Sequence, residues 1–293
     1  MQIYFAAVLI AVGVGCLVAL ILALRPDGGA RRLKAYAQRA ELPVPQASET
    51  ALLGRMRRAK IVEMSSALAA CAISGAILAT PFGATALFPL TVLLPVVLVT
   101  TLLGSTALAL REQLFSPTPD EPRVARAQVV RGADYLDGWQ RAVTWVLAAL
   151  ATAGLVWVAI DCLRGVAPHP EAAPVMVAMT VVALGSVLAA PFVEAAIARR
   201  PQPAATPLEL AWDDALRTSA MHATRFSAGV LCVTSVLLSS LVLLPNPGSP
   251  ATWPLSLVVI AQVVLSRVYP TTGSPLPRRL FPQGIHVAAG STV

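Results

Sequence analysis

Long apolar runs alternate with short polar segments along the whole chain. The first run, residues 3–24, contains no charged side chain, and at about 1.5 Å per residue its length matches a hydrocarbon core of about 30 Å. Six further apolar runs follow at residues 61–80, 87–110, 142–160, 175–197, 226–244 and 255–269. The pattern predicts an all-α fold, a polytopic integral membrane protein with seven transmembrane helices.

The distribution of basic residues predicts the orientation. With seven spans, all of the 22 lysine and arginine residues except Arg164 fall on one side, in the loops, in the tail or, for Arg267, at the end of the seventh run. Basic loops stay in the cytoplasm, so the N-terminus is expected outside and the C-terminus in the cytoplasm. The net charge of +7 is then explained by the anchoring of the spans, and no nucleic-acid partner is expected.

The polar segments also predict the organisation of the chain. The expected parts are an N-terminal transmembrane anchor (1–24), a basic cytoplasmic loop with short helices (25–60), a six-helix membrane bundle of three hairpins (61–269) with amphipathic cytoplasmic loops (111–141 and 198–225), and a flexible cytoplasmic tail (270–293). Within the basic loop, residues 42–45 (Leu-Pro-Val-Pro) predict a break between two helical pieces.

Composition supports this class of protein. Hydrophobic residues make up 56% of the chain and charged residues only 13%, which lies outside the usual range of soluble domains. Only Lys34 and Lys60 are lysines, and alanine is abundant, which is typical of a GC-rich bacterial genome. The expected location is the bacterial cytoplasmic membrane, with the lipid bilayer as the first partner.

Residues 206–209 (Thr-Pro-Leu-Glu) have the form of a capping box and predict that a helix begins at Thr206. Apolar residues then recur at helical spacing on one face, and charged residues line the other. The apolar positions are Leu208, Ala211, Trp212 and Ala215, and the charged ones are Glu209, Asp213 and Arg217. The pattern predicts an amphipathic helix at the membrane surface or against a partner, and a surface helix that leads into the next span is favoured over a dedicated docking site.

A weak internal duplication is also suggested. Residues 118–121 repeat the capping pattern, the spacing of Asp137 and Arg141 repeats that of Asp213 and Arg217, and residues 103–105 match residues 184–186. These three matches suggest that a unit of span, amphipathic loop and span occurs twice.

Few ionisable groups lie inside the apolar runs. Glu63 and Glu194 fall near the cytoplasmic ends of their runs, and His222 lies just before the sixth run. Two carboxylates and a histidine at this depth could form an inner vestibule or a cation site, because intramembrane charges are costly unless they are paired or hydrated. Alternatively, each carboxylate lies at the headgroup level and pairs with Lys60 or with Arg199 and Arg200.

No catalytic or metal-binding pattern is present. The sequence lacks H-E-x-x-H, G-x-S-x-G and G-x-x-x-x-G-K-[ST] motifs, and its 4 cysteines are scattered. His169 lies in an outer loop with Asp161 and Glu171, where a solvated loop is favoured over a metal site. No enzymatic activity, cofactor or metal is therefore expected.

Two functions remain open. The first is a non-catalytic membrane subunit or scaffold that docks a cytoplasmic partner, such as the ATPase of an ABC-type system, through Asp137, Trp139, Trp212 and Asp213. The alternative is a small-solute permease with a path lined by threonine and serine of the third and sixth runs and gated near Glu63 and Glu194. A cytoplasmic protein or a membrane oligomer is the expected protein partner.

Overall fold

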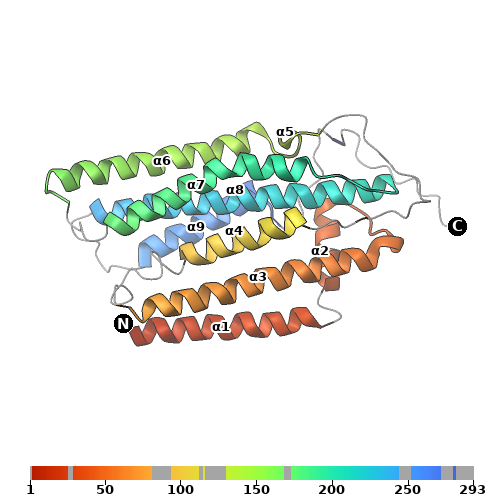
Figure 1. The fold of residues 1–293 in the computed structure, drawn as a ribbon, viewed down its shortest axis with the longest axis horizontal. Coiled ribbons are helices and arrows are strands. Elements are labelled where there is room, and N and C mark those ends of the chain that lie inside the picture. Colours follow the sequence, from red (N-terminus) through yellow and green to blue (C-terminus); the bar gives the residue numbers. More distant parts are fainter. Residues whose placement is uncertain are drawn as a thin grey trace.

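The computed structural model describes residues 2–25, 29–80, 94–111, 115, 130–167, 173–243, 252–271 and 280–281. Every regular element within these ranges is a helix (Figure 1), which confirms the all-α prediction. The helices are α1 (Gln2–Leu24), α2 (Ala30–Ala40), the 3-10 turn η2 (Gln46–Ser48), α3 (Glu49–Leu78), α4 (Leu94–Arg111), α5 (Gly132–Tyr135), α6 (Gly138–Leu163), α7 (Ala173–Ala198), α8 (Pro207–Leu243) and α9 (Thr252–Val268).

The long helices lie side by side and alternate in direction (Figure 1). Helices α1, α4, α7 and α9 finish at the end of the bundle where α3, α6 and α8 begin; this end, which also carries α2 and α5, is called the basic end. The described part of each predicted span falls on one of these helices. The arrangement is that of an up-and-down bundle.

Five of these helices are long and apolar enough to cross a membrane: α1, α3, α6, α7 and α8. Within the described residues, α4 and α9 contribute the shorter apolar helices Pro95–Arg111 and Val259–Val268. Five such helices suggest a multi-pass membrane protein. The count of seven crossings and the orientation stay predictions.

Helix α8 is the centre of the bundle, and α1 lies at its edge. α8 packs against α4, α6, α7 and α9, and 72% of its most apolar stretch is buried, against 11% for α1. Small residues permit close packing of helices: a Cβ atom at Gly154 of α6 would lie 2.8 Å from the Ser239 Oγ of α8. Glycine at this position therefore lets α6 approach the central helix.

Hydroxyl groups inside the bundle bind one another or the backbone. Thr180 of α7 and Ser235 of α8 share a hydrogen bond of 2.6 Å, and Thr234 donates to the carbonyl of Val230 one turn earlier on its own helix. Thr144 of α6 and Tyr269, just after α9, lie 2.9 Å apart. These bonds satisfy polar groups where water is excluded and link neighbouring helices.

Helix α8 is one continuous helix of 37 residues, about 55 Å long. The predicted start is confirmed, because the Thr206 Oγ1 accepts from the Glu209 amide at 3.2 Å. The amphipathic stretch runs directly into the sixth apolar run without a proline or a turn, as expected of a helix that leads into the next span. Its first turns therefore project beyond the bundle, as those of α3 do (Figure 1).

A second apolar core lies at the basic end, apart from the core of the bundle. It joins α2 to the first turns of α3 and α8; this unit, residues 29–56 with residues 207–219, is called the platform. Its buried residues are Leu33, Tyr36, Ala37, Ala40, Leu42, Leu52, Met56, Ala211, Trp212 and Ala215, with Phe115. The predicted break at residues 42–45 is confirmed: α2 ends at Ala40, Glu41 adopts a left-handed conformation, and the chain turns back toward α3.

Close packing holds α2 in the platform. A Cβ atom at Gly29, just before α2, would lie 2.9 Å from the backbone oxygen of Leu53 in α3. Only a residue without a side chain lets the chain cross α3 at this distance. The predicted capping pattern at residues 118–121 and most of the predicted tail lie outside the described residues.

Candidate functional site

Trp212 is the central side chain of the platform. It is fully buried, its indole Nε1 donates to the carbonyl of Pro43 at 2.9 Å, and its ring stacks on Tyr36 with centroids 5.7 Å apart. Sequence reasoning placed Trp212 on a docking face. The structure places it inside the protein, where it joins α8 to the segment after α2.

Tyr36 completes this contact between α2 and α8. Its hydroxyl lies 2.7 Å from the Ser219 Oγ. Burial raises the pKa of the Tyr36 phenol well above its ordinary value, because a phenolate would lose its hydration. The neutral phenol therefore remains available for this hydrogen bond.

Asp213 belongs to a network that fastens α7 to α8. It forms an i,i+4 ion pair with Arg217 at 2.7 Å, and Arg217 donates to the carbonyls of Ile197, Arg200 and Pro201, each at 3.0 Å. A helix leaves its last carbonyls without intrahelical partners. Arg217 satisfies these groups at the end of α7, and Asp213 holds the guanidinium in place.

Asp137 and Trp139 remain exposed at the start of α6. The Asp137 amide donates to the Gln140 Oε1 at 3.0 Å, so this turn caps the helix. Trp139 is 55% exposed and Trp157 is 64% exposed near the other end of α6. Their 18-position separation spans about 27 Å along the helix, which is close to the thickness of a hydrocarbon core, at whose faces tryptophan concentrates.

The predicted vestibule residues have separate surroundings. Glu63 accepts from Arg32 at 2.9 Å and from Lys60 at 3.2 Å, and its side chain is 42% exposed. Glu194 is buried against Arg225, and the second contact of this bidentate pair, from Nη2 to Oε2, measures 3.1 Å. The expected pairing with Lys60 is confirmed for Glu63, whereas that with Arg199 or Arg200 is wrong for Glu194.

Arg225 is the functional candidate that sequence reasoning missed, because it was counted as a loop residue. Its guanidinium is 2% exposed, and its Nη1 is buried without a hydrogen-bond partner in the described part of the chain. One signal was present: Arg217 and Arg225 are eight positions apart, about two helical turns, and so lie on a similar side of α8. That side faces α7.

His222 lies close to the same junction. Its Nδ1 is 3.2 Å from the carbonyl oxygen of Pro270, and its ring meets Tyr269 edge-on with centroids 6.3 Å apart. The Tyr269 hydroxyl donates to the carbonyl of Gln140 at 2.5 Å. His222 therefore connects α8 to the residues that follow α9, whereas Glu63 lies beside α2.

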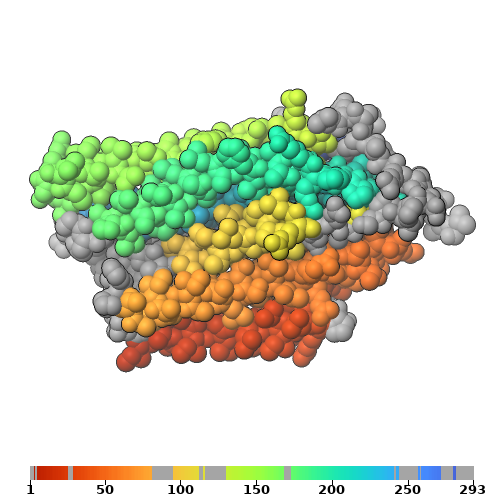
Figure 2. Space-filling view, viewed as in Figure 1, coloured from red at the N-terminus to blue at the C-terminus, as the bar shows by residue number. Residues whose placement is uncertain are grey.

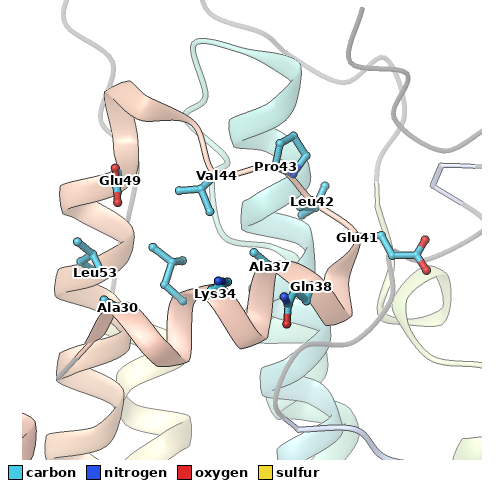
Figure 3. A pocket seen from close by; sticks show the side chains of 11 residues that line it. Ala30, Lys34, Ala37, Gln38, Glu41, Leu42, Pro43, Val44, Glu49 and Leu53 are labelled. Carbon is cyan, nitrogen blue, oxygen red and sulfur yellow. The ribbon is translucent and has the colours of Figure 1, made fainter. Parts of the chain in front are cut away.

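An open groove runs along α2 (Figure 3). Its volume is about 410 Å³, and α2, the returning segment and the first turns of α3 frame it. The apolar walls include Leu33, Ala37, Leu42, Val44 and Leu53, and Lys34, Gln38, Glu41 and Glu49 supply the polar groups.

The described residues hold no group of three or more His, Cys, Asp or Glu side chains that could bind a metal ion. The four cysteines are free thiols in separate places, and Cys232 is buried in the bundle.

The positions that the suggested duplication matches have different surroundings in the structure. A Cβ atom at Gly104 would lie 2.5 Å from the Ser66 Oγ, whereas one at Gly185 would meet nothing within 4 Å. Asp213 lies within α8 while Asp137 precedes α6. The two segments therefore pack differently.

No family model, curated protein or solved structure matches this chain. No relative therefore supplies a function for comparison.

We expect Trp212→Ala to destabilise the protein by about 3 kcal/mol, because it leaves a cavity in the platform and removes the bond to Pro43. Trp139→Ala, at an exposed position, is the control and should cost less than about 1 kcal/mol. Thermal unfolding of the detergent-purified protein measures both. Equal effects of the two variants would contradict the central position of Trp212.

We expect Glu194→Gln and Arg225→Gln each to destabilise the protein by about 3–5 kcal/mol, because each leaves a buried charge without its partner. The double variant Glu194→Leu/Arg225→Met should regain most of this loss, since apolar residues of similar size replace both charges. Unfolding midpoints of the three variants provide the comparison. Additive losses in the double variant would show that the pair is not coupled.

Proposed function

We propose that this protein is a non-catalytic membrane subunit that carries a docking platform for a soluble partner. In this proposal the chain crosses the bacterial cytoplasmic membrane seven times, with its N-terminus outside and the basic end in the cytoplasm. The partner belongs to a multi-component system, and the ATPase of an ABC-type assembly is the model for it. The observation that carries the proposal is the platform, a second apolar core outside the bundle.

The platform is more ordered and more closely packed than a connection between two spans needs to be. A loop between membrane helices needs only a polar, hydrated chain. Here α2 is instead fixed by a stacked Tyr36 and Trp212 pair and by apolar contacts with α3 and α8. Burial of these side chains stabilises one defined shape, as recognition of a protein partner requires.

The groove on α2 is the favoured docking surface. Its apolar walls suit the apolar face of a helix, and helix-in-groove binding is a common mode of peptide recognition. Lys34 and Glu41 are exposed beside it, so both signs of charge border the apolar centre. We therefore propose an amphipathic helix of the partner as the ligand.

The residues chosen from the sequence have different places in this proposal. Trp212 supports the groove from behind, because it holds the carbonyl of Pro43, one of the lining residues. Asp213 holds Arg217 at the end of α7. Trp139 and Asp137 remain exposed but begin α6, where Trp139 suits the headgroup region.

The permease alternative stays a prediction that no observation favours. Thr100 of α4 donates to its own backbone at Val96 over 2.7 Å, and Ser235 of α8 is bonded to Thr180. Glu63 and Glu194 are held in ion pairs. These groups therefore already have partners within the protein.

The proposed topology can be tested with single cysteines in a background without the native ones. Val166→Cys, after α6, should react with a membrane-impermeant maleimide in intact cells, because this turn lies at the outer end. Ala35→Cys, an exposed position of α2, should react only after the membrane is opened. Labelling of Ala35→Cys from outside would contradict the orientation.

The docking proposal can be tested by photo-crosslinking in the native host. A photoreactive amino acid at Gln38, in the groove, should give one protein adduct of defined mass. Ala35, also exposed on α2 but outside the groove lining, is the matched control position and should give none. Ala30→Leu narrows the groove and should weaken the Gln38 adduct by about tenfold, the effect of about 1.4 kcal/mol.

Two outcomes would contradict docking in the groove. One is equal crosslinking at Gln38 and Ala35. The other is a Gln38 adduct that Ala30→Leu leaves unchanged, since a ligand seated between the apolar walls must respond to their spacing.

A further inference from the structure

The lipid-facing edge of the bundle ends in a cluster of positive charge. α1 lies at this edge and packs chiefly against α3 (Figures 1 and 2). Apolar side chains near its C-terminal end are exposed: Val18, Ile21, Leu22 and Leu24. In a bilayer these side chains contact acyl chains, and the end of α1 marks the depth at which the hydrocarbon gives way to headgroups.

Four cations are linked to the end of α1 by direct contacts or by their positions in the sequence. Arg57 of α3 donates through Nη2 to the carbonyl of Leu24, the last residue of α1, and Arg25 follows directly. Lys60 lies one turn beyond Arg57 on α3, and it shares Glu63 with Arg32 of α2.

The cluster carries more positive charge than its own carboxylate neutralises. Within the described residues, Glu63 is the one carboxylate paired with these cations, through Arg32 and Lys60, whereas Arg57 donates to a backbone carbonyl. Arg25 is exposed, and its side chain forms no hydrogen bond or ion pair within the part of the chain that the structure describes. Like charges held together repel, and an anion among them removes that cost.

We propose that these four residues bind the phosphodiester headgroup of an anionic phospholipid, with its acyl chains along the exposed face of α1. The cations recognise the phosphate, and the apolar residues of α1 recognise the part of the ligand that a free phosphate ion lacks. The site lies on the lipid-facing edge, so it is independent of docking in the groove of α2.

The position of the cluster distinguishes it from general attraction to a charged membrane. Arg199 and Arg267 are also exposed arginines of the basic end, but each lies on or after a different helix, α7 and α9. They are therefore a control pair that changes the net charge equally without touching the proposed site.

Native mass spectrometry of the full-length protein in detergent tests the proposal. Phosphatidylglycerol and phosphatidylcholine with the same acyl chains are titrated separately, and we expect tighter binding of phosphatidylglycerol. Arg25→Gln/Arg32→Gln should weaken phosphatidylglycerol binding by about thirtyfold. Arg199→Gln/Arg267→Gln should change it by less than about threefold. Arg57 stays intact, because it also satisfies the end of α1.

A second variant changes the affinity in the opposite direction. Glu63→Gln removes the carboxylate that competes with the lipid for Arg32 and Lys60, so phosphatidylglycerol should bind about fivefold more tightly. Damage to the fold would weaken binding instead. Melting temperatures without added lipid show whether each variant is folded.

Three results would overturn the proposal. The first is an equal loss in the two arginine double variants, which indicates general electrostatic attraction. The second is weaker binding in a folded Glu63→Gln variant. The third is displacement of the lipid by inorganic phosphate at equal concentration, which assigns the cluster to a soluble anion.

Discussion

The buried pair of Glu194 and Arg225 fixes how α7 and α8 lie against each other. Two charges withdrawn from water are tolerated only when they meet in good geometry, and here both oxygens of the carboxylate face the guanidinium. Two turns along α8, Arg217 binds the last carbonyls of α7. Together Arg217 and Arg225 fix the position of α8 along the axis of α7. This position determines where the first turns of α8 extend beyond the bundle.

The platform depends on that position. Trp212 can reach the carbonyl of Pro43 and the ring of Tyr36 only if α8 emerges at the correct height and rotation. The arrangement joins segments about 170 positions apart in the chain. The membrane bundle and the platform are therefore two cores that share one helix.

Much of the fold follows from local patterns in the sequence. Apolar runs located the long helices, Pro43 and Pro45 located the break after α2, and the sequence around Thr206 located the start of α8. These signals are local, because they depend on residues within a few positions of one another. The ion pair of Asp213 and Arg217 was predictable for the same reason, since its partners lie one turn apart.

The partners of Trp212 and Glu194 could not be predicted in this way. Periodicity shows that Trp212 lies on an apolar face, but membrane, protein partner and α2 all offer apolar contacts to such a face. Likewise, Glu194 has arginines close to it in sequence, whereas its partner comes from the next helix. The continuity of α8 did have a signal, because neither proline nor glycine occurs between Leu208 and Ala228.

An unbroken α8 has a mechanical consequence. Because α8 is a stiff helix that belongs to both cores, it can tilt as a unit, and the ion pair of Glu194 and Arg225 lies near the pivot of such a tilt. From Arg225 to Trp212 is about 20 Å along the axis, so a tilt of about 10° would carry the indole sideways by about 3 Å. A shift of that size is comparable with the length of a hydrogen bond. Motion among the buried helices and reshaping of the exposed groove are therefore geometrically tied.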